Sequence, residues 1–282
     1  MKIAISVEST NDLSKELIEK YNIQVVPYHI TLGNETFKDG EVPVEEIFTF
    51  VDNNGILPKT NAINEFEYTE YFESLKKDFD AVVHICLSSG LSSSCGNAQR
   101  AAANVKNVYV IDSLSLSTGI GLLAMYAGDL VNDGHLPEDI ARMVTERVSA
   151  LQVSFIVERL DYLYKGGRCN AMALLGANIF KIRPRIVVKD GKMGSDKKYR
   201  GTMGKVMEKY GREVLEEFNT PDLERVFITY TTATEEMLDA ARQVCKEAGF
   251  KNIYETRAGC TISSHCGANT MGILYFNDGG NK

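Results

Sequence analysis

The feature that most constrains this chain is the alternation of short apolar runs with segments of helical periodicity. Apolar runs typical of buried strands lie at 2–7, 23–32, 81–87, 108–111, 226–231 and 271–276. Segments with apolar residues at helical spacing lie at 13–21, 44–51, 65–77, 94–104, 117–132, 137–151, 202–218 and 234–248. Strands that alternate with helices in this way favour the α/β class, in which helices cover a parallel sheet.

The organisation changes near residue 150, and 282 residues are enough for two domains. Asp190-Gly191 separates the segments 185–188 and 192–193, and this dipeptide favours the tight turn of a β-hairpin. We therefore expect two α/β domains, with a parallel sheet in residues 1–150 and a mixed sheet in residues 151–282.

Composition and charge exclude several classes of protein. The chain carries 31 Lys and Arg against 38 Asp and Glu, a net charge of −7 without an extended basic run, which argues against a nucleic-acid partner. It has no stretch of 18 apolar residues, so stable membrane insertion is not expected. The first residues lack the apolar region of a signal peptide, and the six cysteines form no C-x-x-C pair. A reducing, cytoplasmic location is therefore expected.

A serine-rich loop follows the third apolar run. Five of the seven residues at 88–94 are serines, and a helix begins directly after them. In open α/β folds ligands gather at the carboxyl ends of strands, where hydroxyls and free backbone N–H groups bind an anion or a carboxyl group. On spacing alone, the favoured interpretation is that one of the serines 92–94 caps the helix. Thr60 lies in a second polar loop and by itself indicates only a turn.

Two further segments carry groups that suit contact with an anion. Gly166-Gly167 precedes Arg168, which is either directed at a carboxylate or phosphate or a solvated loop cation. His265 lies among small polar residues and could carry a proton, offer a charge to a partner, or form a hydrogen bond within the core, the last being favoured. A thiol–imidazole pair of Cys95 and His265 lacks a third, orienting group.

Taken together, the motifs resemble those of the DegV family of bacterial fatty-acid-binding proteins, over essentially the whole chain. The most specific match is the signature L-x-Y-L-x-K-G-G-R, intact at 160–168. The other matches follow the family order: D-S-T-x-D-like residues at 8–12, Asp39-Gly40, Thr60 of a T-S-Q-P-like segment, S-S-x-L-S-G-T-like residues at 88–94, V-I-D-S at 110–113, K-x-R at 198–200 and H-x-G-P-G-like residues at 265–269. Eight motifs in the right order make the resemblance specific.

The resemblance implies a function for the chain and roles for five residues. Family members are two-domain α/β proteins that hold one long-chain fatty acid in an apolar tunnel at or near the domain junction. By resemblance, Thr60 and Ser92 bind the carboxyl group of the fatty acid, and Arg168, Arg200 and His265 contact a partner or a phosphate. The implied partner is an ATP-dependent fatty-acid kinase subunit, which converts the presented carboxyl group to acyl phosphate. The resemblance implies a binding protein and not an enzyme, with no cofactor and no metal.

The chemistry of a long acyl chain is compatible with this function. A sixteen-carbon acid has roughly 14 methylenes, each worth about 0.8 kcal/mol when buried, whereas each hydrogen bond to the headgroup contributes about 1 kcal/mol. Burial of the acyl chain is therefore expected to dominate affinity. The hydroxyls are expected to fix the register of the acyl chain, that is, how far it extends into the tunnel. Residues 171–182 are apolar enough to form a tunnel wall, although an ordinary core helix fits them as well.

Two other functions stay open at this point. Ser92 or Cys95 would serve as the nucleophile of a hydrolase or acyltransferase. Alternatively, the chain is a lipid-binding regulatory protein that has no kinase partner.

Overall fold

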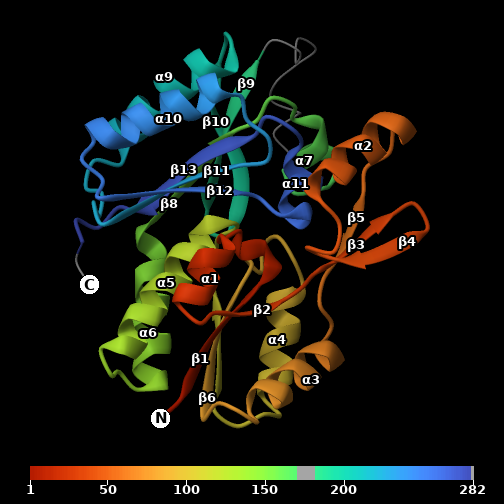
Figure 1. Ribbon diagram of the computed structural model, residues 1–282, viewed down its shortest axis with the longest axis vertical. Helices are drawn as coiled ribbons and strands as arrows, with labels where there is room; N and C mark the ends of the chain where they lie inside the picture. The colour runs from red at the N-terminus through yellow and green to blue at the C-terminus, as the bar shows by residue number, and fades with distance from the viewer. Residues whose placement is uncertain (170–181, 281–282) are drawn as a thin grey trace.

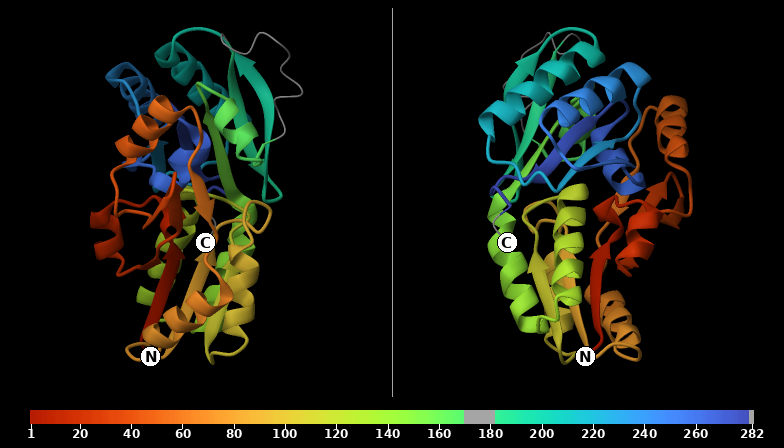
Figure 2. Two further views of the ribbon diagram at one scale, coloured as in Figure 1. Left: turned by 90° about the vertical axis from the view of Figure 1, so that its right-hand side faces the viewer. Right: turned by 60° about the vertical axis from the view of Figure 1, so that its left-hand side comes forward.

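The computed structural model of the protein describes residues 1–169 and 182–280 and contains three sheets with helices packed around them (Figure 1). Figure 2 shows the two larger sheets at opposite ends of the long axis of the molecule. The expected tunnel wall at 171–182 lies outside the described residues except for Ile182, so that expectation stays a prediction.

The N-terminal sheet is parallel, in the order β2-β1-β6-β7. Its strands are β1 (Ile3–Glu8), β2 (Gln24–Val26), β6 (Ala81–Cys86) and β7 (Val108–Asp112). The helices around it are α1 (Lys15–Lys20), α3 (Glu65–Leu75), α4 (Ser94–Ala102), α5 (Thr118–Asn132) and α6 (Pro137–Arg147). Every residue of β6 is buried, as is typical of a parallel strand that helices cover on both faces. The parallel sheet expected in the first half of the chain is confirmed.

The C-terminal sheet is mixed, in the order β10-β9-β8-β13-β11-β12. Its strands are β8 (Leu151–Ile156), β9 (Arg183–Lys189), β10 (Lys192–Tyr199), β11 (Arg225–Tyr230), β12 (Asn252–Arg257) and β13 (Met271–Phe276). Only β11 and β12 pair in parallel. Two helices, α9 (Met203–Glu217) and α10 (Glu235–Glu247), pack against each other beside it. Asp190 and Gly191 have φ angles of 50° and 75° and form the expected hairpin turn between β9 and β10.

The strand expected at 23–32 is wrong as a single element. Pro27 lacks the N–H group that a strand needs to continue its ladder, and the chain leaves the N-terminal sheet there. A new strand, β3 (His29–Leu32), pairs instead with β4 (Glu35–Lys38) and β5 (Lys59–Asn61) in a small antiparallel sheet. Thr60 therefore stands on a strand and not in a loop.

Helix α5 joins the two larger sheets. It contacts β1 on one side and β8 and β13 on the other, and nearly all of its residues are buried. An apolar helix of this kind is typical of the interior of a protein. Gly121 allows a close approach, since a Cβ atom there would lie 2.6 Å from the Leu13 side chain. One core cluster consequently runs through both sheets, from Ile5 to Phe227.

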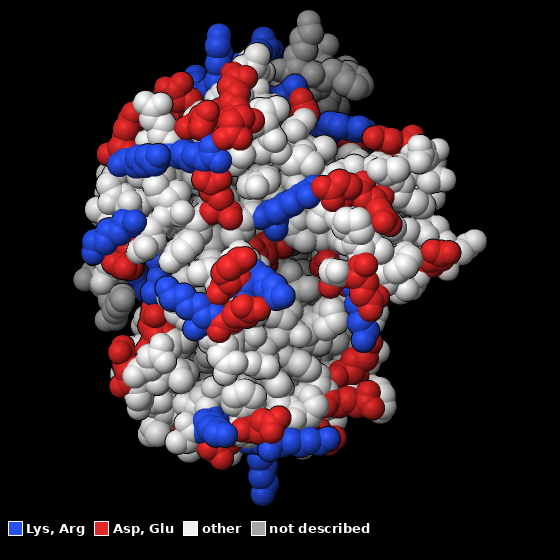
Figure 3. Space-filling view, in the orientation of Figure 1, with Lys and Arg blue, Asp and Glu red and all other residues white. Residues whose placement is uncertain are grey.

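The remaining helices are α2 (Val44–Asn54), α7 (Asp161–Lys165) and α11 (Cys260–Cys266), with short 3₁₀ turns at Ser9–Asn11 and Val148–Ala150. Helix α11 contacts α2, α7 and the small sheet, so a C-terminal helix packs on residues from the first quarter of the chain. Within residues 1–169 and 182–280, no helix has the length and apolar character needed to cross a membrane. Figure 3 shows acidic and basic side chains interspersed over one face of the molecule.

Candidate functional site

A cavity of about 370 Å³ lies where the carboxyl end of β6 meets α11, α7 and the small sheet. Its size falls within the range of small-molecule sites. The lining side chains come from widely separated parts of the chain: Tyr28, Thr60, Asn61, Ala62, Leu87, Leu91, Ser92, Ser93, Leu116, Arg168, Met193, Thr261, Ile262, His265 and Cys266. Four of the five residues singled out by the family resemblance are therefore brought together here.

Ser92 lies in the loop between β6 and α4. Its Oγ accepts a hydrogen bond from the Tyr28 hydroxyl at 2.9 Å and another from the backbone N–H of Ser94 at 3.2 Å. Burial raises the pKa of Tyr28 well above its usual value, so this phenol stays protonated and remains a donor. With two donors already directed at its oxygen, Ser92 retains its own proton for a ligand. Ser92 thus bonds to the first residue of α4 and also lines the cavity, whereas Ser93, the N-cap residue of that helix, makes no side-chain capping bond.

Thr60 and His265 connect the small sheet to α11. The Oγ1 of Thr60 lies 2.8 Å from the Nε2 of His265. Burial, assisted by the nearby charge of Arg168, lowers the pKa of His265 to about 4, so the imidazole is neutral at neutral pH. In the tautomer with the proton on Nε2, the imidazole donates to Thr60, and the threonine proton is available to a ligand.

The Gly-Gly pair before Arg168 has a structural reason. A Cβ atom at Gly166 would lie 2.6 Å from the Nδ1 of His265, so only glycine lets α7 approach this ring. Gly167 has a φ of 71°, a left-handed conformation that glycine adopts without strain. Within the described chain, the Nδ1 of His265 is buried and has no hydrogen-bond partner.

Arg168 carries the positive charge of the cavity. Its guanidinium donates to the backbone carbonyls of Gly166 at 2.5 Å and Leu91 at 3.4 Å. Among the described residues that line the cavity, no other Lys or Arg and no Asp or Glu occurs. A guanidinium without a carboxylate beside it suits an anionic group.

Arg200 does not join this group. It lines a separate cavity of about 320 Å³ beside α9, together with Lys198, Lys205 and Lys209. Of the three residues expected to contact a partner or a phosphate, Arg168 and His265 therefore line the cavity of about 370 Å³, whereas Arg200 lies in the separate one.

A small apolar cavity adjoins the cavity of about 370 Å³, which we call the polar cavity. It measures about 30 Å³ and shares Leu116, Ile262 and Cys266 with its neighbour. Its other lining residues come mainly from the C-terminal sheet and the segments around it: Ser117, Phe155, Thr229, Tyr230, Thr231, Ala258, Thr270, Gly272 and Leu274. The polar cavity thus borders an apolar space between the two larger sheets.

Two carboxylates hold α11, the helix that carries His265, and sequence reasoning missed both roles. Asp39 accepts hydrogen bonds from the N–H groups of Cys260 at 2.9 Å and Thr261 at 3.2 Å. Asp12 accepts from the Gly259 N–H at 2.8 Å and from the Ser117 hydroxyl. Burial raises the pKa of Asp12 to about 7, and the charge of Asp39 adds to this effect. The cap-rich residues near Asp12 were the available signal, but Asp12 itself bonds to the start of a helix that lies far away in the sequence.

Ser92 and Cys95, the two candidate nucleophiles of a hydrolase or acyltransferase, lie in different surroundings. Cys95 is buried on α4 and is not among the residues that line the cavity. Ser92 lines the cavity together with His265, but the Nε2 of that imidazole is bonded to Thr60. Among the described residues, the Nε2 of His265 is thus bonded to Thr60 and to neither of these two candidate nucleophiles.

Comparison with known proteins agrees with the fold. The family model described as "Uncharacterised protein, DegV family" matches residues 2–278. A DegV domain-containing protein of Caldanaerobacter subterraneus is 28% identical over 281 residues, covering 97% of this chain and 98% of the relative. The crystal structure of a DegV lipid binding protein from Thermotoga maritima is similar with a TM-score of 0.87 and 25% identity over 98% of each chain. DegV of Bacillus subtilis, a fatty acid binding protein, is similar with a TM-score of 0.85 and 26% identity, covering 98% of this chain and 99% of that one.

With a family model matched along nearly its entire length, this chain belongs to the DegV family.

Proposed function

We propose that this protein binds one long-chain fatty acid, with the carboxyl group in the polar cavity and the acyl chain directed into the apolar one. The similar proteins of Thermotoga maritima and Bacillus subtilis are described as binding lipid and fatty acid. The observation that carries the proposal is that Thr60, Ser92, Arg168 and His265 line a single cavity. Hydroxyls, a neutral imidazole and one guanidinium form a set that suits a group with a single negative charge.

Arg168 has a distinct role in this proposal. Thr60 and Ser92 are neutral, and a carboxyl group held only by neutral groups in a dry cavity has a raised pKa and tends to be protonated. The guanidinium of Arg168 opposes this effect by favouring the ionised form. His265 is neutral itself and contributes through its hydrogen bond to Thr60.

The acyl chain supplies most of the affinity. Burying roughly 14 methylenes is worth about 11 kcal/mol, from which the costs of association and of ordering the chain are subtracted. The apolar cavity of about 30 Å³ has roughly the volume of one water molecule. The acyl chain therefore has to move side chains apart when it enters, and the ligand shapes the deep part of its own site.

We propose further that the bound carboxylate is presented to an ATP-dependent fatty-acid kinase subunit. There a carboxylate oxygen would attack the γ-phosphorus of ATP, forming acyl phosphate and releasing ADP. Arg168 would keep the attacking group ionised, and Arg200, which lies outside the cavity, would contact the partner. In this scheme the chain is the binding subunit of two α/β domains, residues 1–150 and 151–282, and the chemistry belongs to the partner.

Isothermal titration calorimetry with palmitate, hexadecanol and octanoate tests the binding proposal. Palmitate is expected to bind in a one-to-one ratio and more tightly than hexadecanol, which lacks the charge, or octanoate, which lacks half of the chain. Equal affinity for all three would contradict a site with a charged end and an apolar end.

A fluorophosphonate probe separates the hydrolase alternative, because a covalent adduct at Ser92 would support an enzyme. ATP turnover by a cognate kinase separates a kinase substrate from a regulatory lipid-binding protein. The proposal expects turnover only when both this protein and a fatty acid are present.

A further inference from the structure

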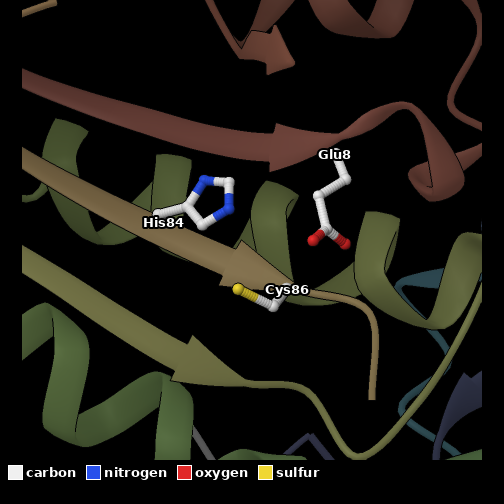
Figure 4. A group of neighbouring side chains, drawn as sticks. All are labelled: Glu8, His84 and Cys86. Carbon is white, nitrogen blue, oxygen red and sulfur yellow. The ribbon is translucent and has the colours of Figure 1, made fainter. Parts of the chain in front are cut away.

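Four polar side chains lie together on one face of the two central strands of the N-terminal sheet. Ser6 and Glu8 alternate along β1, His84 and Cys86 alternate along β6, and Ser6 is paired with His84 in the strand register. Alternate residues of a strand point to the same face, so all four side chains face the same side. Figure 4 shows three of them, with Glu8 at the end of its strand and His84 and Cys86 on the neighbouring strand.

Three of these side chains carry atoms that bind metals. A carboxylate oxygen of Glu8, a ring nitrogen of His84 and the sulfur of Cys86 all lie within 4.8 Å of one another, and all three residues are buried. Around a zinc ion the corresponding metal–ligand distances are about 2.0 to 2.3 Å. Small rotations of these side chains would be enough to bring the three atoms to a common ion.

The second ring nitrogen of His84 is already held in place. Its Nδ1 lies 2.9 Å from the Ser6 hydroxyl, which in turn lies 2.8 Å from the hydroxyl of Tyr71. The Nε2 is buried and has no hydrogen-bond partner within the described chain, although His84 is 0% exposed. Metal-binding histidines characteristically use one ring nitrogen for such a bond and the other for the ion. Aromatic rings of Tyr68, Tyr71 and Phe72 pack edge-on to the imidazole and fix its plane.

Glu8 is buried without a compensating cation. It accepts hydrogen bonds from the Tyr68 hydroxyl at 2.5 Å and the Leu87 N–H at 2.6 Å, and it pairs with no Lys or Arg of the described chain. A buried carboxylate that lacks a positive partner is unfavourable, and coordination of a divalent ion would remove this cost.

We propose that Glu8, the Nε2 of His84 and the thiolate of Cys86 form a binding site for one divalent transition-metal ion of the zinc class. A set of ligands made of a thiolate, an imidazole and a carboxylate binds zinc in preference to calcium or magnesium. Binding would release the proton of the Cys86 thiol to solvent. A water molecule would complete four-coordination.

The proposed ion would stabilise the start of the loop between β6 and α4, which contains Leu87 and Ser92. Leu87, whose N–H donates to Glu8, lines the polar cavity, and the same loop continues to Ser92. Metal binding at this site does not depend on which ligand occupies the polar cavity. The protein could therefore bind a fatty acid without binding the metal, or bind the metal without binding a fatty acid.

Cobalt(II) titration of the metal-free full chain tests the site, because a thiolate bound to cobalt gives a charge-transfer absorption band. One equivalent of Co²⁺ is expected to produce this band and Zn²⁺ to abolish it, with one bound zinc per chain by elemental analysis after dialysis. Cys86→Ser and His84→Gln are expected to weaken cobalt binding at least tenfold. Cys245→Ser, which alters a buried cysteine on α10, is the matched control and is expected to bind cobalt as the unaltered chain does.

If a variant fails to fold, cobalt titration of the unaltered protein still tests whether the metal site exists. Absence of the charge-transfer band in the folded, unaltered protein would overturn the proposal. Full retention of the band in a folded Cys86→Ser variant would overturn it as well. Circular dichroism establishes in each case whether the chain is folded.

Discussion

The two cavities that meet at Leu116, Ile262 and Cys266 differ in what they offer to a ligand. The polar cavity is open in the structure, and its hydroxyls, imidazole and guanidinium are held by hydrogen bonds that involve no ligand. The apolar cavity is an order of magnitude smaller, at about 30 Å³ against about 370 Å³. In the proposed function, a headgroup would thus meet a preformed site, whereas an acyl chain would have to open its own path.

We therefore propose that the polar cavity sets the orientation of the ligand and that burial of the acyl chain in the apolar cavity supplies most of the affinity. Each hydrogen bond in the polar cavity is worth about 1 kcal/mol, and a charged one about 1.5 to 3 kcal/mol. Each methylene buried beyond Ile262 adds about 0.8 kcal/mol, so a few carbon atoms outweigh any single polar contact. Substitutions on the apolar side should therefore change affinity most.

The largest loss of affinity is expected when Ile262, which lines both cavities, is changed to Trp. The indole would close the passage, and excluding even four methylenes would cost about 3 kcal/mol, or a factor of roughly a hundred in Kd. Calorimetry should show this loss for palmitate and a much smaller one for octanoate. The control is Leu215→Trp, at a partly buried position on α9 that lines neither cavity. Equal losses for both acids would contradict a passage at Ile262.

A smaller loss is expected for Arg168→Gln. Removing the charge should weaken palmitate binding by about 1.5 to 3 kcal/mol, roughly a factor of 10 to 100. Binding of hexadecanol should not change, because the alcohol carries no charge. Arg142→Gln, on the exposed side of α6, serves as the control for loss of an arginine. A similar loss for acid and alcohol would assign Arg168 a role in packing instead of charge recognition.

Ser92→Ala and Thr60→Val should each reduce affinity by about 1 kcal/mol, roughly fivefold. Because these hydroxyls are proposed to fix the position of the acyl chain along its path, the variants should also discriminate less sharply among acids that differ by two carbons. Ser74→Ala, at an exposed position on α3, is the matched control. An unchanged profile of affinity against chain length in both variants would show that the hydroxyls do not set the register.

The smallest effect on affinity is expected for Asp12→Asn, which acts on the stability of the protein. The pKa of Asp12 in the folded protein is raised to about 7. The folded state therefore holds this proton more tightly than the unfolded state does, and the contribution of Asp12 to stability falls as pH rises from about 4 to 7. The difference would reach at most about 4 kcal/mol and level off above pH 7.

Urea unfolding at pH 4, 5.5, 7 and 8.5 measures this effect. Relative to the unaltered protein, Asp12→Asn should become progressively more stable up to pH 7 and gain nothing beyond. A stability difference that does not vary with pH would show that Asp12 does not titrate in this range.

Local features of the fold could be predicted from the sequence because neighbouring residues determine them. The Asp190-Gly191 turn has the expected conformation, and α3 begins at Glu65, where the helical periodicity begins. The break at Pro27 and the strands β8 and β12 were missed, since all three depend on which sheet the chain joins. Asp39 shows the same limit, because its helix cap on Cys260 spans 221 residues of sequence.

The candidate site could be predicted only in part. Local spacing indicated a turn at Thr60, a helix cap among the serines 92–94 and a core hydrogen bond at His265. It left Arg168 open between an anion contact and a solvated loop cation, and it did not connect these residues. The family resemblance grouped them with Arg200, which the structure places in a different cavity. Tyr28, which holds Ser92, could not be found from sequence, because its partner lies 64 residues away. The ligand contacts of all these residues remain predictions.

Native mass spectrometry of the full chain purified from a bacterial host tests the central claim most directly. The account predicts one additional mass per chain, equal to that of a long-chain fatty acid, which is absent or strongly reduced in Ile262→Trp and retained in Leu215→Trp. A chain that carries no lipid and takes up no added palmitate would contradict it.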